Sequence, residues 1–210
     1  MATASSCRDG GIYFRLDGKG SNDDGNQWDD GAGGEVREIC ICHGPIVYSI
    51  QTTYERQGTL LCSRRHGGTD GNFDFISLSS PLTWVSGHYS SWCWDPDLLL
   101  FPDEEEEPYN FCKVIRSLKF GTADGATYGP YGRGIGEPFD FRCSTGIAGF
   151  HGRDDSFRLN AIGVYVKSAA KGVIDDATVI SRGASADVNS SGALPLRSSS
   201  SRKLLDEPKA

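Results

Sequence analysis

The chain has 210 residues, of which 38% are hydrophobic and 10% aromatic, so it can form a buried core and is not globally disordered. Its 27 glycines are nearly twice the ordinary share and lie between β-branched and aromatic runs, which favours a turn-rich all-β protein. A formal net charge of −7 without a lysine–arginine cluster argues against binding to nucleic acid or to an anionic membrane surface.

The beginning of the chain has no apolar stretch of the kind found in a secretory signal, and no later apolar run has the length of a membrane span. We therefore expect residues 1–9 to be a flexible N-terminus. We also expect the protein to stay in the cytoplasm, with the nucleus as an alternative. In such a reducing compartment its seven cysteines are expected to be free thiols.

Short strands separated by turns are predicted throughout residues 10–167. The clearest strand patterns lie at 36–42, 46–54, 73–78, 82–89, 114–120, 146–150 and 159–166. Ala123, Asp124 and Gly125 predict a hairpin turn. We find no segment with the period of an amphipathic helix.

A weak internal repeat runs through this region. Pro45-Ile46, Pro81-Leu82 and Gly146-Ile147 each open a predicted strand directly after a turn, at offsets of 36 and 65 residues. Three similar β units predict a closed all-β body with pseudo-threefold symmetry.

The uneven spacing is explained by residues 91–112, which contain three prolines and the five-residue acidic run 103–107. We interpret this segment as an inserted surface loop; the alternative is a site for a cation or a basic partner. After residue 167 the chain has no aromatic residue and nine serines, so 168–210 is expected to be a flexible serine-rich tail.

Signatures of enzymes and metal sites are weak. The glycines at 18 and 20 lack the spacing of a phosphate-binding loop, and no helix is predicted after the glycines at 132, 134 and 136. The four histidines have no metal-ligand spacing, and no set of nucleophile and base is found. Cys40 and Cys42 fall on one side of a strand and are interpreted as buried structural thiols. We expect no catalytic activity, no metal and no cofactor.

Two polar loops, at 22–27 and 152–156, combine backbone N–H groups with short polar side chains. Such groups can bind the hydroxyl groups of a sugar. Ordinary turn chemistry explains the same composition and is the preferred interpretation from these residues alone.

Nine segments settle what the chain resembles. They are 28–31 (Trp-Asp-Asp-Gly), 36–39, 50–54, 66–68 (His-Gly-Gly), 85–89, 115–120, 128–132, 147–153 and 161–166. In this order they resemble the jacalin-related lectins over about residues 10–167. The resemblance implies a plant source and a β-prism of three four-stranded Greek-key sheets around a pseudo-threefold axis. It also implies binding of mannose- or glucose-containing glycans without catalysis, metal or cofactor.

The resemblance also places the carbohydrate site. In mannose-binding members a glycine three residues before the Trp-Asp-Asp-Gly segment donates its backbone N–H to the sugar, and Gly25 holds that position. A Gly-x-x-x-Asp motif supplies a carboxylate acceptor and two further N–H groups. Here Ser156 replaces the glycine, Phe157 and Arg158 supply the N–H groups, and Asn160 replaces the aspartate, in a loop one residue longer than usual.

These replacements predict a weakened site. A neutral acceptor at Asn160 costs about 1 kcal/mol relative to a carboxylate, or roughly fivefold in affinity. Ser156 adds strain if the replaced glycine has a positive φ. A second sugar site, found in some members beside a loop such as 66–68, is not expected because Tyr48 stands where an aspartate is needed.

Two hypotheses follow. The first is a lectin for mannose- or glucose-type glycans that gains avidity as a homo-oligomer. The alternative is a β-prism protein-interaction module, acting in stress or defence responses, whose sugar binding is weakened or lost. In that case the insert 91–112 and the tail serve a protein partner.

Overall fold

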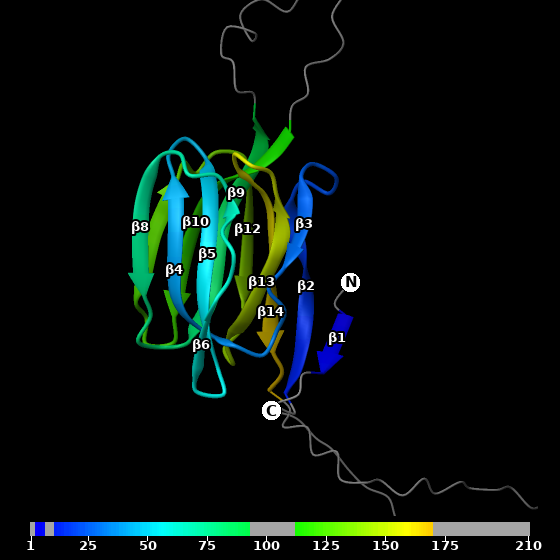
Figure 1. Cartoon of the computed structure of the whole chain (residues 1–210), viewed down its shortest axis with the longest axis vertical. Coiled ribbons are helices and arrows are strands. Elements are labelled where there is room, and N and C mark those ends of the chain that lie inside the picture. Colours follow the sequence, from blue (N-terminus) through cyan, green and yellow to red (C-terminus); the bar gives the residue numbers. More distant parts are fainter. Residues whose placement is uncertain (1–2, 7–10, 93–111, 170–210) are drawn as a thin grey trace, which may run out of the picture. The chain divides into compact units, whose positions relative to one another are not determined.

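The computed structural model describes residues 3–6, 11–92 and 112–169, which form a β-prism of three antiparallel sheets (Figure 1). Strands account for all of the regular structure in these residues, and none of the described chain is a helix able to cross a bilayer. The fold class predicted from the sequence is therefore confirmed. The predicted insert at 93–111 and the predicted tail at 170–210 lie outside the described residues.

The first sheet is built from both ends of the domain. Its order is β1 (Thr3–Ser6), β2 (Ile12–Gly20), β14 (Leu159–Lys167), β13 (Ile147–Asp154) and β3 (Asn26–Asp29). Because β2 and β3 flank the hairpin of β13 and β14, the N-terminal and C-terminal strands hold each other in one sheet.

The second sheet has the order β6 (Thr59–Cys62), β5 (Val47–Arg56), β4 (Glu35–His43) and β8 (Asn72–Ser77), with the short β7 (His66–Gly67) also paired to β5. Across the sheet, β6, β5, β4 and β8 are the third, second, first and fourth of these strands in chain order, which is the arrangement of a Greek key.

The third sheet has the same arrangement. Its order is β11 (Thr127–Gly132), β10 (Cys112–Thr122), β9 (Leu82–Trp92) and β12 (Glu137–Arg142). In the first sheet β2, β14, β13 and β3 follow the same order when β13 is counted as the first strand and β2 as the third. Three Greek keys related by a pseudo-threefold axis are therefore confirmed. β1 and β7 are short additions to that plan.

The predicted number of three repeat units is correct, but the predicted start of one unit falls at the wrong strand. Two of the three predicted units begin at β9 and β13, which are corresponding strands of their Greek keys. The first was placed at Ile46, just before β5, whereas the corresponding strand is β4. Ile46, Leu82 and Ile147 are all buried, so the sequence similarity reflects burial after a turn and not equivalent topology.

Within residues 1–9, for which the sequence predicts flexibility, the structure describes one short strand. Thr3–Ser6 forms strand β1, which pairs antiparallel with β2, and the other residues of that segment lie outside the described part. Backbone hydrogen bonds to an open sheet edge do not require apolar side chains, so composition gave no sign of this strand.

The core lies between the inner faces of the three sheets. Ile41 and Ile50 come from the second sheet, Leu118 and Phe120 from the third, and Phe150 from the first, all of them fully buried. Alternation of buried and exposed residues along the strands sets these side chains inward. The predicted turn at 123–125 is confirmed between β10 and β11, where Gly125 has a φ of +88°.

Two facing glycines on the outer side of the first sheet allow a test of its packing. A Cβ added at Gly163 would lie 2.2 Å from the His151 ring, which cannot move away because both ring nitrogens are hydrogen-bonded. Gly163→Ala should therefore lower the free energy of unfolding by about 1–3 kcal/mol. The matched control is Gly18→Ala, whose Cβ would meet nothing closer than 3.7 Å. Urea denaturation of both variants checks this, and equal stability would contradict the packing described.

Candidate carbohydrate-binding site

Three loops from distant parts of the sequence meet at one end of the prism. A Cβ added at Gly25 would lie 2.5 Å from the carbonyl oxygen of Asp154 and 3.0 Å from Oδ1 of Asn160. One added at Gly68 would lie 2.5 Å from the carbonyl oxygen of Phe157. The loops can approach this closely only because these positions have no side chain. The structure thus brings Gly25 together with the predicted residues 156–160.

Asp155, which the sequence analysis did not single out, organises the loop between β13 and β14. Its Oδ1 accepts hydrogen bonds from the backbone N–H groups of Phe157 (2.8 Å) and Arg158 (2.9 Å). Its Oδ2 accepts from Nε of Arg158 at 2.8 Å. The two N–H groups assigned by resemblance to a sugar are therefore occupied by a carboxylate of the same loop.

The charge on Asp155 is stabilised by this arrangement. Partial burial by itself would raise the pKa of the carboxyl group. The hydrogen bonds from the Arg158 side chain and from the N–H of Phe157 outweigh that effect, so the pKa lies below its ordinary value. An aspartate commonly forms a turn in which its carboxylate accepts hydrogen bonds from the backbone N–H groups two and three residues later. That pattern could have identified Asp155 from the sequence.

Asn160 differs from its prediction as an accessible acceptor, because its exposed fraction is 0%. Its Nδ2 donates a long hydrogen bond of 3.5 Å to the carbonyl oxygen of Lys113, and its Oδ1 is buried without a hydrogen-bond partner. The N–H of Lys113 in turn donates to Oδ2 of Asp24 at 3.2 Å. The start of β10, directly after the insert, thus covers the side chain that was expected to face the ligand.

Three of the other predicted residues are exposed, whereas Arg158 is partly buried. Phe157 is 59% exposed and Ser156 and Gly25 are exposed as well, so the rim of the site is accessible. Ser156 is absent from the positive-φ positions, of which Gln57 is the single non-glycine example among the described residues. The backbone strain predicted at Ser156 is therefore absent.

Arg153 fixes the loop that carries Gly25. Its Nε donates to the carbonyl oxygen of Asp24 at 2.9 Å, and one of its terminal nitrogens donates to those of Asp23 (2.8 Å) and Gly25 (3.0 Å). Ser21 adds a hydroxyl donor to Asp24 at 2.8 Å. A guanidinium group bound to three successive carbonyl oxygens makes this loop a fixed wall of the site.

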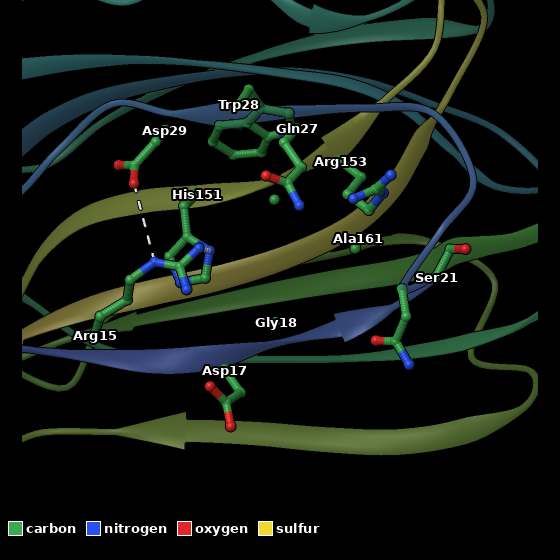
Figure 2. A pocket seen from close by; sticks show the side chains of 12 residues that line it. Arg15, Asp17, Gly18, Ser21, Gln27, Trp28, Asp29, His151, Arg153 and Ala161 are labelled. Atoms are coloured by element: carbon green, nitrogen blue, oxygen red, sulfur yellow. Dashed lines mark hydrogen bonds and ion pairs between the residues drawn. The ribbon is translucent and has the colours of Figure 1, made fainter. Parts of the chain in front are cut away.

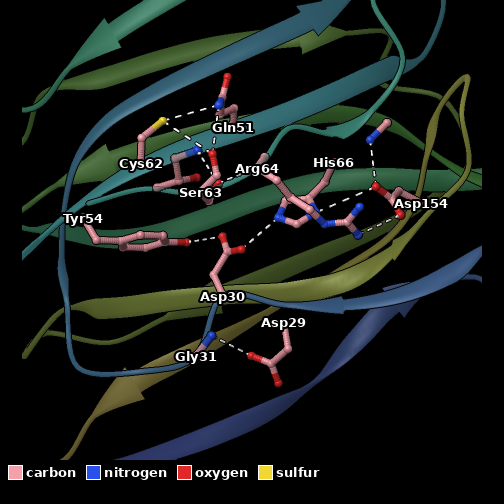
Figure 3. Close-up of polar contacts among 12 residues, drawn as sticks. Asp29, Asp30, Gly31, Gln51, Tyr54, Cys62, Ser63, Arg64, His66 and Asp154 are labelled. Carbon is pink, nitrogen blue, oxygen red and sulfur yellow. Dashed lines mark hydrogen bonds and ion pairs between the residues drawn. The ribbon is translucent and has the colours of Figure 1, made fainter. Parts of the chain in front are cut away.

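A buried polar network lies behind the loops (Figure 3). Nε2 of His66 is 2.8 Å from Asp30, which also accepts the Tyr54 hydroxyl at 2.8 Å, and the His66 ring stacks on Trp28 at 3.7 Å. Asp154 lies 3.7 Å from the second ring nitrogen of His66 and accepts the backbone N–H of the next residue, Gly67, at 2.9 Å. The network therefore ties the glycine loop of the second sheet to β13 of the first.

The position of a second sugar site is filled. Tyr48 is buried, its ring lies against Gly44 and Gly71, and its carbonyl oxygen accepts the N–H of Gly68 at 3.0 Å. A phenol packed between glycines supplies no carboxylate acceptor for a sugar. The absence of sugar binding at this position stays a prediction.

The described residues contain no group of three or more histidine, cysteine or acidic side chains placed to hold a metal ion. The five cysteines that the structure describes are free thiols. Cys42 is buried as predicted, because it packs with Ile46, Tyr48 and Val114, whereas Cys40 on the same side of β4 is partly exposed.

The arrangement of three Greek keys with a glycine-lined loop cluster at one end matches a known family. The Jacalin-like lectin domain model matches residues 17–165. The chain belongs to the jacalin-like lectin family. The resemblance stated from the nine sequence segments is confirmed.

The similar proteins include some that are named lectins and some that are not. The chain is 34% identical over 157 residues to Jacalin-related lectin 3 of Arabidopsis thaliana, covering 71% of this chain and only 24% of that protein. It is 35% identical over 150 residues to the Arabidopsis thaliana Protein RESTRICTED TEV MOVEMENT 1, covering 67% of this chain and 76% of that protein.

Solved structures of jacalin-like lectins show the same fold. A mannose-specific jacalin-related lectin from Morus nigra in complex with mannose has a TM-score of 0.59 at 31% identity, covering 73% of this chain and 94% of that one. An artocarpin–mannotriose complex has a TM-score of 0.61 at 28% identity, covering 73% and 96%.

The buried network predicts how stability depends on alkaline pH. Burial, together with the Asp30 carboxylate, raises the pKa of Tyr54 well above its ordinary value of 10.0. Above about pH 10 the unfolded chain loses this proton while the folded chain keeps it, so the free energy of unfolding falls as pH rises. The fall approaches about 1.4 kcal/mol per pH unit from this residue.

Chemical denaturation between about pH 9.5 and 11.5 tests this dependence. Tyr54→Phe should show a shallower decline than the wild type. Tyr165→Phe is a useful comparison, because burial and Asp29 raise the pKa of Tyr165 to about 12 and its contribution has the same sign. Equal slopes for the wild type and Tyr54→Phe would contradict the network.

Proposed function

We propose that this jacalin-like protein binds mannose- or glucose-type glycans, without catalysis, at the loop cluster of Gly25 and residues 155–160. The observation that carries the proposal is the buried Oδ1 of Asn160, an acceptor without a partner beside the exposed backbone of Gly25. Buried polar atoms are nearly always hydrogen-bonded, and a sugar hydroxyl group is a suitable donor. The site needs no metal, because side-chain and backbone groups supply its donors and acceptors.

Binding requires a local rearrangement of the loop. Asp155 must release the N–H groups of Phe157 and Arg158, and Asn160 must become accessible to the ligand. A charged acceptor within the loop competes favourably with a neutral sugar hydroxyl, since hydrogen bonds to charged groups are about twice as strong. We therefore expect weak affinity for a single sugar, and useful binding through homo-oligomers or clustered glycans.

Removing the competing carboxylate should strengthen binding. We expect Asp155→Ala to bind methyl α-mannoside roughly tenfold more tightly than the wild type, a gain of about 1.4 kcal/mol. Isothermal titration calorimetry measures this, with methyl α-galactoside as the control ligand. Asp140→Ala is the matched control protein, because Asp140 also pairs with a nearby arginine, Arg142, but lies on β12 of the third sheet.

The outcome decides between clear alternatives. Tighter binding of the mannoside by Asp155→Ala, with Asp140→Ala like the wild type, supports the proposal. Absence of heat with folded Asp155→Ala at tens of millimolar mannoside would remove this site from consideration, because the main internal competitor is then gone.

A second candidate function is a protein-interaction module. The closure of the site by Asp155 and Lys113 favours it, since the same contacts that cover Asn160 reduce access for a sugar. A role in stress or defence responses through the insert 91–112 belongs to this candidate. Cytoplasmic location, with the nucleus as an alternative, suits either function.

Deleting residues 93–111 separates the two functions. Trp92 and Cys112 are paired neighbours on β9 and β10, so an Asn-Gly turn can join them without moving either strand. For the interaction module, the deletion should abolish capture of a protein partner while any mannoside affinity measured by calorimetry is retained. Loss of mannoside affinity with unchanged partner capture would contradict this candidate.

A further inference from the structure

A hollow on the outer face of the first sheet lies outside the predicted site (Figure 2). Its volume of about 460 Å³ falls in the ordinary range of small-molecule sites. Gly18, Gly152 and Ala161 contribute to its lining without large side chains, on strands β2, β13 and β14. The hollow exists because small residues adjoin one another across three paired strands.

The polar groups around the hollow are held in place by their own contacts. Arg15 donates to Nδ1 of the buried His151 at 2.9 Å, and the other nitrogen of this ring is 2.8 Å from the carbonyl oxygen of Leu16. Asp29 accepts the Tyr165 hydroxyl and the N–H of Gly31, both at 2.7 Å. A ligand would meet a guanidinium group and a carboxylate whose positions are already fixed, which lowers the entropic cost of binding.

The charges lining the hollow balance. Arg15 and Arg153 contribute two positive charges, and Asp17 and Asp29 contribute two negative charges. His151 adds none at neutral pH, because burial lowers the pKa of its imidazole. The exposed amide side chains of Asn22 and Gln27 add neutral donors and acceptors. Balanced charge with many hydrogen-bonding groups suits a neutral polyhydroxylated ligand better than an anion, a cation or an apolar molecule.

The hollow adjoins the loop that carries Gly25. Ser21 and Asn22, at the start of that loop, line the hollow, and Arg153 lines it while holding the carbonyl oxygen of Gly25 at 3.0 Å. A short chain of linked sugars could therefore contact both places on opposite sides of one fixed loop.

We propose that this hollow is a subsite for a further neutral sugar residue of a glycan bound at the Gly25 loop, which rests on the proposed glycan binding. Arg15 and the two amides donate hydrogen bonds to sugar hydroxyl groups, and Asp29 accepts them. Gly18 and Ala161 make room for the ring. The expected ligand is an oligosaccharide, because a single sugar can occupy only one of the two places.

The test compares methyl α-mannoside with a linear α-mannotrioside, using calorimetry and ¹⁵N-resolved NMR titration of the full chain. The wild type should bind the trioside at least about tenfold more tightly than the mannoside, with shifts at Gly18, Gln27 and the 155–160 loop. Gly18→Leu, which fills the hollow, should reduce trioside affinity to that of the mannoside and leave mannoside affinity unchanged.

Milder and matched variants keep the test decisive if Gly18→Leu folds poorly. Gln27→Ala removes one exposed amide of the hollow and should lower trioside affinity severalfold. Asn72→Ala is its control, because Asn72 is an exposed amide at the start of β8 in the second sheet. Thermal melting of each variant verifies that it is folded.

Each result supports or overturns the subsite. Equal affinity for both ligands in the wild type, with shifts confined to the loop, overturns the subsite and leaves the proposed function standing. Shifts at Gly18 and Gln27 without shifts at 155–160 overturn the subsite as an extension of the loop site, because the hollow would then bind sugar alone, and they refute the loop assignment. Absence of shifts with either ligand overturns the subsite and the proposed function together.

Discussion

The pairing of the two ends of the domain in one sheet is the constraint on which the rest of the structure depends. β2 pairs with β14 and β3 with β13, so the first residues of the lectin domain close the prism against the last. At Gly20 an added Cβ would lie 2.2 Å from the carbonyl oxygen of Asn160, and the next N–H, of Ser21, donates to that same oxygen. Without this approach the loop of Gly25 would have no fixed relation to residues 155–160, and neither the site nor the adjoining hollow would exist.

The buried network extends the same constraint to a second sheet. His66 lies between Asp30, at the end of β3, and Asp154, at the end of β13, and is stacked on Trp28. A buried histidine flanked by two carboxylates is stable only where hydrogen bonds compensate for lost hydration. Here the Tyr54 hydroxyl and a backbone N–H supply part of that compensation. The loop between β13 and β14 therefore starts from a buried, hydrogen-bonded polar base at Asp154.

In the candidate site, a side chain of the protein competes with any ligand for the same backbone N–H groups. In a sheet-end loop, backbone N–H groups need acceptors, and they can be satisfied by a ligand, by water or by a neighbouring side chain. Asp155 satisfies those of Phe157 and Arg158 and adds a charge-assisted bond to the Arg158 side chain. A single carboxylate thus closes the loop on itself, while the surrounding prism stays that of a jacalin-like lectin.

The sequence alone determined the all-β class, because strand alternation and turn residues are local patterns, and its family motifs predicted the three Greek keys. The same motifs predicted a site at Gly25 and 156–160, residues that the structure brings close together. Only the tertiary structure decided that β1 pairs with an open edge, that Lys113 covers Asn160, and that Arg153 and Asp155 hold the loops. These outcomes depend on contacts between residues as far apart as positions 23 and 153, which follow from how the sheets close and not from any pattern along the chain.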